Sequence, residues 1–201
     1  MSDWYPPLGR AIPALALAAV ITFSADHSAR LGLLCFGAFA TVSGVLLSAL
    51  VWRSRTTPAG RVQLVQGAIT LVAGIVGLVL SGGGLPFLVF LVTAWAAVTG
   101  MLELWLGIRY RGRDRAARDW IFAGALTALL AVAVLLVPPG LAQAFTGPDG
   151  VTRELTAAVV VVGLLGAYAA LLGVFLTIGA LSLKWSPEAG VVAPEPRGTR
   201  S

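Results

Sequence analysis

The sequence predicts an all-α polytopic membrane protein, a bundle of six transmembrane helices arranged as three parallel repeats of one helical hairpin. Composition is the first reason: 58% of the 201 residues are hydrophobic and 11% are charged, against about 45–50% and about 25% in soluble domains. The second reason is that the apolar residues gather in long segments. The third is that these segments repeat along the chain.

The apolar segments lie near residues 11–25, 31–52, 62–81, 85–107, 120–137 and 155–184. Most approach the roughly 20 residues that cross a hydrocarbon core of about 30 Å. We interpret them as helices, because backbone groups in lipid must be bonded internally and long uninterrupted runs do not suit a barrel. Residues 1–185 then form one transmembrane domain. Residues 186–201, rich in Pro, Gly and charge, form a tail that we expect to be disordered in the cytoplasm.

The first segment has two interpretations. It is short and contains Pro13, and Arg10 followed by an apolar run has the shape of a signal peptide. A signal peptide needs small residues before its cleavage point, and Phe23-Ser24-Ala25 supplies them poorly. We therefore expect a retained helix.

Basic residues predict the orientation of the bundle. One side carries Arg10, Arg53, Arg55, Arg61, Arg109, Arg111, Arg113, Arg115, Arg118, Lys184, Arg197 and Arg200, and the other carries Arg30 and Arg153. An excess of Lys and Arg in short loops marks the cytoplasmic face, so both termini are expected in the cytoplasm. Aromatic residues typical of a membrane interface lie at the same boundary: Trp52, Trp105, Tyr110, Trp120 and Trp185.

An internal repeat indicates how the helices are related. Residues 10–15, 67–72 and 124–129 align at the starts of the odd-numbered segments, and residues 40–46, 96–102 and 169–175 align in the even-numbered ones. The repeats span about residues 10–53, 61–111 and 118–184, one helical hairpin each. Because each repeat crosses twice, all three run in the same direction, unlike the inverted repeats of many transporters.

Each even-numbered segment carries an alanine four residues before a glycine. The pairs are Ala40 and Gly44, Ala96 and Gly100, and Ala169 and Gly173. Small residues at this spacing let two helix backbones approach closely in lipid. We interpret them as packing residues within one bundle. The alternative is a contact with a second copy of the chain or with other membrane proteins.

These features together resemble the HdeD-like acid-resistance membrane proteins. The resemblance covers roughly residues 10–184. It is carried by the threefold hairpin, residues 67–80, Trp95 with Gly100 and Glu103, Arg109-Tyr110-Arg111, Trp120, and Leu135-Leu136-Val137-Pro138. It implies a small six-helix protein of the bacterial inner membrane, linked to survival of acid stress and without an established reaction.

The chain departs from that family pattern in two places. Ser81-Gly82-Gly83-Gly84 stands where the family tends to carry a proline, and the third repeat contains an insertion over residues 139–154. Residues 141–145 of the insertion have a short apolar face, followed by a turn over 147–150. The insertion could lie along the membrane surface, touch a partner, or form an unstructured loop.

Glu103 is the most informative candidate for a functional site. It lies near the cytoplasmic end of the fourth segment, roughly one to two turns before Arg109, with which it could pair. Gln63 and Gln66, at the start of the third segment, are candidate hydrogen-bond partners on the same side. Apart from Lys184, which ends the last segment, no other charged residue lies inside a predicted segment, so we favour a structural interfacial pair over a transport role.

The rest of the sequence lacks the motifs of most enzyme, metal and cofactor sites. The sequence has no HExxH, CxxC, P-loop, GxSxG or dinucleotide motif, and its single histidine and single cysteine, His27 and Cys35, leave no metal or nucleophile set. We expect no enzymatic activity and no cofactor. His27, beside Asp26 in an outer loop, is a candidate pH sensor, although one exposed histidine moves only one charge. The net charge of +5 comes from residues beside apolar segments, which argues against nucleic-acid binding.

Two functions follow as expectations. The first is a non-enzymatic membrane protein that acts in acid or stress tolerance, or as an accessory subunit packed against other membrane proteins. The second is a small permease or channel with a polar cleft near Glu103. A polar cavity that reaches Glu103 favours the permease, and a bundle packed shut by its small residues favours the structural protein.

Overall fold

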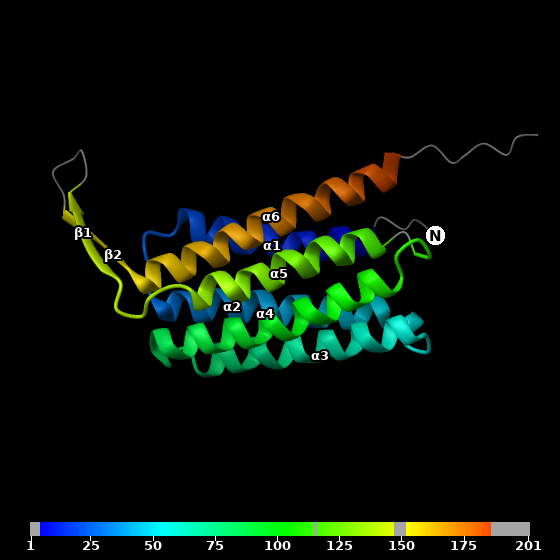
Figure 1. Cartoon of the computed structure of the whole chain (residues 1–201), viewed down its shortest axis with the longest axis horizontal. Helices are drawn as coiled ribbons and strands as arrows, with labels where there is room; N and C mark the ends of the chain where they lie inside the picture. Colours follow the sequence, from blue (N-terminus) through cyan, green and yellow to red (C-terminus); the bar gives the residue numbers. More distant parts are fainter. Residues whose placement is uncertain (1–4, 115, 147–151, 186–201) are drawn as a thin grey trace, which may run out of the picture.

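The structure, a computed structural model, describes residues 5–114, 116–146 and 152–185. Within these residues the chain forms an elongated bundle of six α-helices, with a small β-hairpin projecting from one end (Figure 1). The helices are α1 (Tyr5–Phe23), α2 (Ala29–Val51), α3 (Pro58–Val79), α4 (Gly84–Arg109), α5 (Ala117–Leu135) and α6 (Ala157–Trp185), with a 3-10 turn, η1 (Trp52–Ser54), after α2.

Five helices, α2 to α6, are long and apolar enough to cross a membrane. The prediction of a helical membrane bundle is therefore confirmed, and each observed helix overlaps one predicted segment. The shorter helix α1 is apolar from Pro7 to Phe23. It begins well before the predicted residue 11, which places Arg10 inside the helix instead of at its flank.

Polar residues in the connections fix where two helices begin. The hydroxyl of Ser28 accepts a hydrogen bond from the N–H of Leu31 at the start of α2, and the hydroxyl of Thr57 accepts one from Gly60 at the start of α3. Such caps bond backbone donors that have no partner within the helix. Between α3 and α4 the chain turns through Gly84, whose φ of 71° suits glycine.

The closest packing joins α2 to α3, α4 to α5, and α1 to α6. Glycines make it possible. A Cβ on Gly44 would lie 2.5 Å from a backbone nitrogen of α3, and one on Gly100 would lie 2.7 Å from a backbone nitrogen of α5. A Cβ on Gly173 would lie 2.7 Å from the Leu15 side chain of α1. The three predicted glycine positions thus lie inside this bundle, each in contact with the helix that packs most closely on its own.

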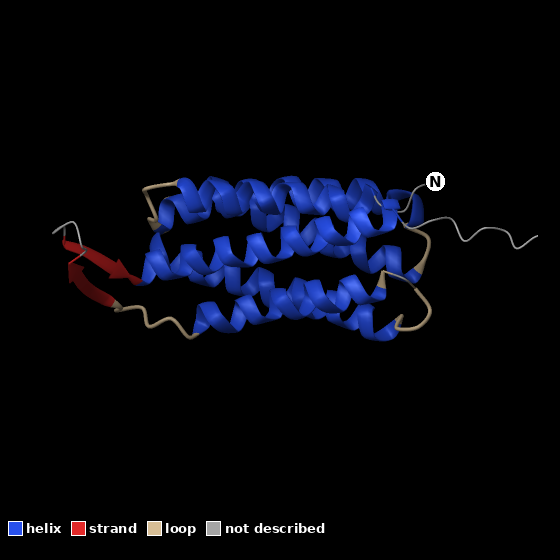
Figure 2. Ribbon diagram, turned by 90° about the horizontal axis from the view of Figure 1, so that it is seen from above, coloured by secondary structure: helices blue, strands red, loops and turns tan. Residues whose placement is uncertain are grey.

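The last helix returns to the first. At the end of the bundle away from the β-hairpin (Figure 2), the start of α1 and the end of α6 lie together (Figure 1), because α6 packs antiparallel along α1. We call this the terminal end, and the opposite end, where the β-hairpin projects, the hairpin end. The described chain is thus a closed arrangement of helices in which residues far apart in sequence meet.

The insertion after α5 forms the β-hairpin. Strand β1 (Ala142–Thr146) pairs antiparallel with β2 (Thr152–Thr156), with Ala144 opposite Glu154. An unstructured loop, one of the expected alternatives for the insertion, is therefore wrong. Threonine and phenylalanine favour strands, and pairing between the two short segments bonds their backbones. The predicted turn over 147–150 and the predicted disordered tail over 186–201 lie outside the described residues.

The core differs between the two halves of the bundle. Toward the hairpin end it is filled by fully buried apolar side chains, among them Leu33, Leu88, Val92 and Val162. The buried polar and charged residues, Gln66, Thr70, Thr99, Glu103 and Thr127, lie deeper toward the terminal end. The core is therefore mostly apolar toward the hairpin end, and most of its buried polar residues lie from the middle of the bundle toward the terminal end.

Candidate functional site

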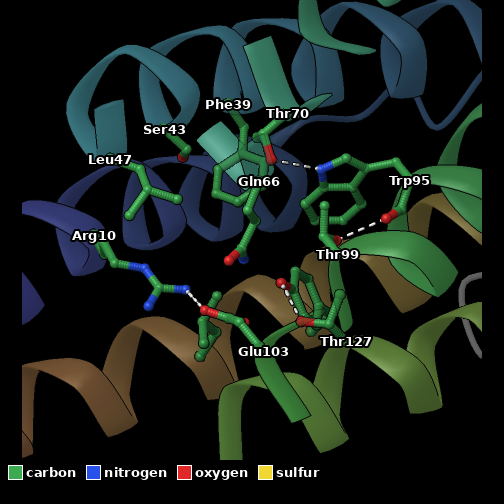
Figure 3. Close-up of a pocket in the computed structure, with 12 residues that line it drawn as sticks. Arg10, Phe39, Ser43, Leu47, Gln66, Thr70, Trp95, Thr99, Glu103 and Thr127 are labelled. Atoms are coloured by element: carbon green, nitrogen blue, oxygen red, sulfur yellow. Dashed lines mark hydrogen bonds and ion pairs between the residues drawn. The ribbon is translucent and has the colours of Figure 1, made fainter. Parts of the chain in front are cut away.

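A cavity of about 40 Å³ lies among the helices at the polar part of the core. Every helix supplies at least one of its walls. The lining residues are Arg10, Phe39, Ser43, Leu47, Gln66, Thr70, Trp95, Thr99, Glu103, Thr127, Tyr168 and Leu172 (Figure 3). A cavity lined from all six helices exists only in the complete bundle.

An ion pair forms one wall of the cavity. The guanidinium of Arg10, from α1, donates a hydrogen bond from Nη2 to Oε1 of Glu103, from α4 (Figure 3). Glu103 is only 3% exposed. Its position is about 9 Å from the end of α4, given a rise of about 1.5 Å per residue, so it lies within the helix and not at its last turn.

The predicted partner Arg109 does not form this pair. Arg109 lies exposed in the last turn of α4, whereas Glu103 points into the bundle. Sequence reasoning missed Arg10 because it placed the residue outside the first helix. The sequence does contain a signal for an earlier helix start. Pro6 and Pro7 follow Tyr5, and proline is tolerated in the first turn of a helix, so a helix that begins at Tyr5 and includes Arg10 was compatible with the sequence.

The two glutamines lie in different places. Gln66 is 5% exposed, lines the cavity, and points into it with its amide on the side of the Arg10–Glu103 pair (Figure 3). Gln63, one turn earlier, is half-buried and lines a separate cleft nearer the terminal end. Gln66 and Glu103 therefore line the same cavity, and Gln63 lies outside it.

Hydrogen bonds organise the side of the cavity nearest the centre of the bundle. The indole N–H of Trp95 donates to the hydroxyl of Thr70 at 3.1 Å, which links α4 to α3. The hydroxyls of Thr127 and Tyr168 are 3.0 Å apart and link α5 to α6. Thr99 donates to the carbonyl of Trp95 within its own helix at 2.7 Å. These groups therefore already have partners.

Aromatic rings separate the cavity from the hairpin end. The ring centroid of Trp95 lies 5.2 Å from that of Phe36, 6.1 Å from that of Phe39 and 6.2 Å from that of Tyr168, all at edge-to-face angles. Phe39, Trp95 and Tyr168 each directly precede one of the aligned alanines Ala40, Ala96 and Ala169. Sequence reasoning could have used this register to place the three rings together.

On the other side, a cleft of about 230 Å³ lies next to the cavity at the terminal end. Arg10 and Leu47 line both spaces. The half-buried carboxylate of Asp119, in the first turn of α5, lines only the cleft, with Gln63. The Arg10 side chain therefore stands between the cavity and the terminal end.

The other candidates lie away from this site. His27 is half-buried in the connection between α1 and α2, at the hairpin end. Cys35 is a free cysteine in α2. Among the residues that the structure describes, no three His, Cys, Asp or Glu side chains gather closely enough to hold a metal ion. The groups that the cavity offers for hydrogen bonding are the Arg10–Glu103 pair, the Gln66 amide and the Ser43 hydroxyl.

Comparison with known proteins adds no relative to this picture: no protein-family model, no curated protein and no solved structure matches the chain.

Proposed function

We propose that this protein is a small non-enzymatic permease of the bacterial inner membrane, which admits a small polar solute to its central cavity from the terminal end. The observation that carries the proposal is the polar cavity at the Arg10–Glu103 pair, lined from all six helices. Ionisable groups inside a membrane are costly, and where they occur they commonly mark the path of a solute or ion.

A purely structural ion pair explains the cavity less well. A pair that only ties α1 to α4 needs no open space beside it. Yet Gln66 stands in that space and bonds to no other described residue. Buried polar groups are nearly always hydrogen-bonded, so an unbonded amide next to a cavity favours a site that receives a ligand or water.

The proposed topology has six crossings with both termini in the cytoplasm. Helix α1, with 19 residues, is about 28 Å long and packs along α6, which supports its role as a retained crossing. Exposed arginines gather at the terminal end, among them Arg53, Arg55, Arg61 and Arg111. Because such residues mark the cytoplasmic face, the cleft beside Arg10 opens toward the cytoplasm.

A second candidate is the acid- or stress-tolerance role implied by the resemblance to HdeD-like proteins, including a role as an accessory subunit. The glycine contacts of the bundle favour this structural role. Close helix packing and the aromatic rings fill the core toward the hairpin end, where a solute would have to pass to cross the protein. The aligned glycines face helices of the same chain, so a second copy or another membrane protein would bind a different surface. The lipid bilayer is the one partner that both candidates require.

The experiment is a solute-flux assay with the full chain in liposomes. A panel of water, ammonia, small amides, K⁺ and Cl⁻ is tested on the wild type, Glu103→Gln and Gln66→Leu. Glu154→Gln, an exposed carboxylate on β2, is the matched control. Gln66→Leu keeps the ion pair and removes only the amide, so it serves where Glu103→Gln folds poorly.

The permease requires wild-type flux of at least one solute above that of protein-free liposomes. This flux should persist in Glu154→Gln and be lost in Gln66→Leu, with both proteins monodisperse in detergent. Absence of flux for the whole panel in folded wild-type protein would rule the permease out and leave the stress-tolerance role.

A further inference from the structure

Two unbonded polar groups face the central cavity. Gln66 is 5% exposed, and its amide makes no hydrogen bond with any described residue. The hydroxyl oxygen of Ser43 is fully buried and also has no hydrogen-bond partner there. Groups left in this state cost free energy unless something in the cavity bonds them. A hydrogen-bonding molecule in the cavity would bond both groups, whereas the two other unpartnered buried hydroxyls among the described residues, those of Thr41 and Thr93, do not line the cavity.

The cavity wall presents both hydrogen-bond donors and hydrogen-bond acceptors to a bound molecule. A guanidinium has five N–H donors, and Arg10 uses one of them, from Nη2, on Oε1 of Glu103. The other carboxylate oxygen of Glu103 accepts no hydrogen bond from a described residue. The Gln66 amide adds two donors and one acceptor. A molecule that can both donate and accept matches this set better than a pure acceptor or a pure donor.

Charge balance decides between ions and neutral molecules. The two charged groups of the cavity wall are Arg10 and Glu103, which cancel each other. The remaining titratable wall group, the Tyr168 hydroxyl, is bonded to Thr127. Asp119 does not line the cavity, but its carboxylate lines the outer cleft together with Arg10 and attracts the guanidinium from that side. An ion in the cavity would thus add an uncompensated charge at membrane depth, which is costly, whereas a neutral molecule adds none.

The size of the cavity limits the molecule. About 40 Å³ exceeds the roughly 10–15 Å³ that one water needs and falls well below the roughly 150 Å³ of a cavity that binds benzene. The rest of the wall combines apolar side chains, including Phe39, Leu47 and Leu172, with hydroxyl-bearing residues. The space suits a molecule of very few non-hydrogen atoms and excludes sugars, amino acids and nucleotides.

The geometry points to a neutral, hydrogen-bonding solute of the size of water, ammonia or formamide as the substrate, held between the Gln66 amide and the Arg10–Glu103 pair. This inference rests on the proposed permease and specifies its substrate class. It also gives the ion pair a role in selectivity, because two opposite charges present strong hydrogen-bonding groups to the solute while the site as a whole stays neutral and rejects ions.

The test measures charge selectivity in liposomes that contain the full chain. Wild type, Arg10→Gln, Glu103→Gln and the double variant are compared for flux of formamide and ammonia, and for K⁺ and Cl⁻ flux under an applied potential. Glu103→Gln leaves Arg10 uncompensated, so this variant should gain Cl⁻ flux. Arg10→Gln leaves Glu103 uncompensated and should gain K⁺ flux. The double variant is neutral again and should lose both ion fluxes.

Three outcomes separate the substrate class from the permease itself. Wild-type flux of formamide or ammonia without ion flux, with opposite ion selectivity in the two single variants, supports the inference. Wild-type flux of K⁺ or Cl⁻ and none of the neutral probes overturns the substrate class and keeps the permease. No flux of any probe in folded wild-type protein overturns both. Where a single variant does not fold, the comparison of neutral and ionic probes in the wild type still decides between these outcomes.

Discussion

The indole of Trp95 is hydrogen-bonded to the hydroxyl of Thr70 at 3.1 Å, and this bond joins two helices that otherwise contact each other much less than either contacts its close partner. Helix α3 packs mainly on α2, and α4 packs mainly on α5. The bond therefore connects two separately packed pairs at the wall of the central cavity.

Replacing Thr70 by valine tests that connection. Thr70→Val keeps the shape of the side chain and leaves the buried indole N–H without a partner, so we expect a loss of about 1 kcal/mol in unfolding free energy. The Trp95 indole resonance should shift in NMR spectra of protein with ¹⁵N-labelled tryptophan. Thr177→Val is the control, because that hydroxyl bonds only to Gly173 of its own helix.

A double-mutant cycle measures the ion pair. Arg10→Gln or Glu103→Gln alone leaves a buried charge unpaired, which typically costs about 3–5 kcal/mol. The double variant should lose clearly less than the sum of the two, as measured by reversible unfolding in detergent. The same cycle with Arg109→Gln and Glu103→Gln should show no coupling, since Arg109 is exposed at the end of α4. Coupling to Arg109 instead of Arg10 would contradict the observed pair.

Glycine substitutions test the close helix approach. Gly100→Ala places a Cβ 2.7 Å from the backbone nitrogen of Ala128, so α4 and α5 must separate and the melting temperature should fall. Gly163→Ala is the matched control within α6, where a Cβ meets nothing within 4 Å. It should be neutral or stabilise by up to about 1 kcal/mol through better helix propensity. Equal effects of the two substitutions would argue against close packing at Gly100.

Single cysteines test the proposed orientation. Cys35 is first replaced by serine, and Ala25→Cys, at the hairpin end, is compared with Thr56→Cys, at the terminal end. In intact cells a membrane-impermeant maleimide should label residue 25 only, and after permeabilisation it should label both. Labelling of residue 56 in intact cells would invert the topology and place the cleft beside Arg10 outside the cytoplasm.

Hydropathy predicted the helices well because length and apolar composition alone decide whether a segment can cross a membrane. It could not predict the β-hairpin, since strands at Ala142–Thr146 and Thr152–Thr156 depend on pairing between two short segments. The small-residue spacing identified Gly44, Gly100 and Gly173, but only the structure shows which helix each one contacts.

The candidate site was predicted in part. Glu103 and Gln66 stand out in sequence because polar side chains are rare in apolar segments, and both line the cavity. Arg10 did not stand out, because an arginine beside a segment is the normal topology signal and its depth depends on where α1 begins. Thr70 has no sequence signal of its own, since threonine is common in membrane helices that bind nothing. Tyr168 is marked only by its place directly before the aligned Ala169.

The return of α6 onto α1 has a consequence for how the protein is made. Chains emerge from the ribosome from the N-terminus, at about 5–20 residues per second. In the proposed topology of six crossings, Arg10 enters the bilayer before Glu103 has been synthesised, and α6, which completes the cavity and covers α1, is inserted last. During that interval Arg10 has no partner and α1 is not yet packed against α6. Insertion of this protein should therefore depend more strongly on the membrane insertion machinery than insertion of a bundle in which the first helices pack only on each other.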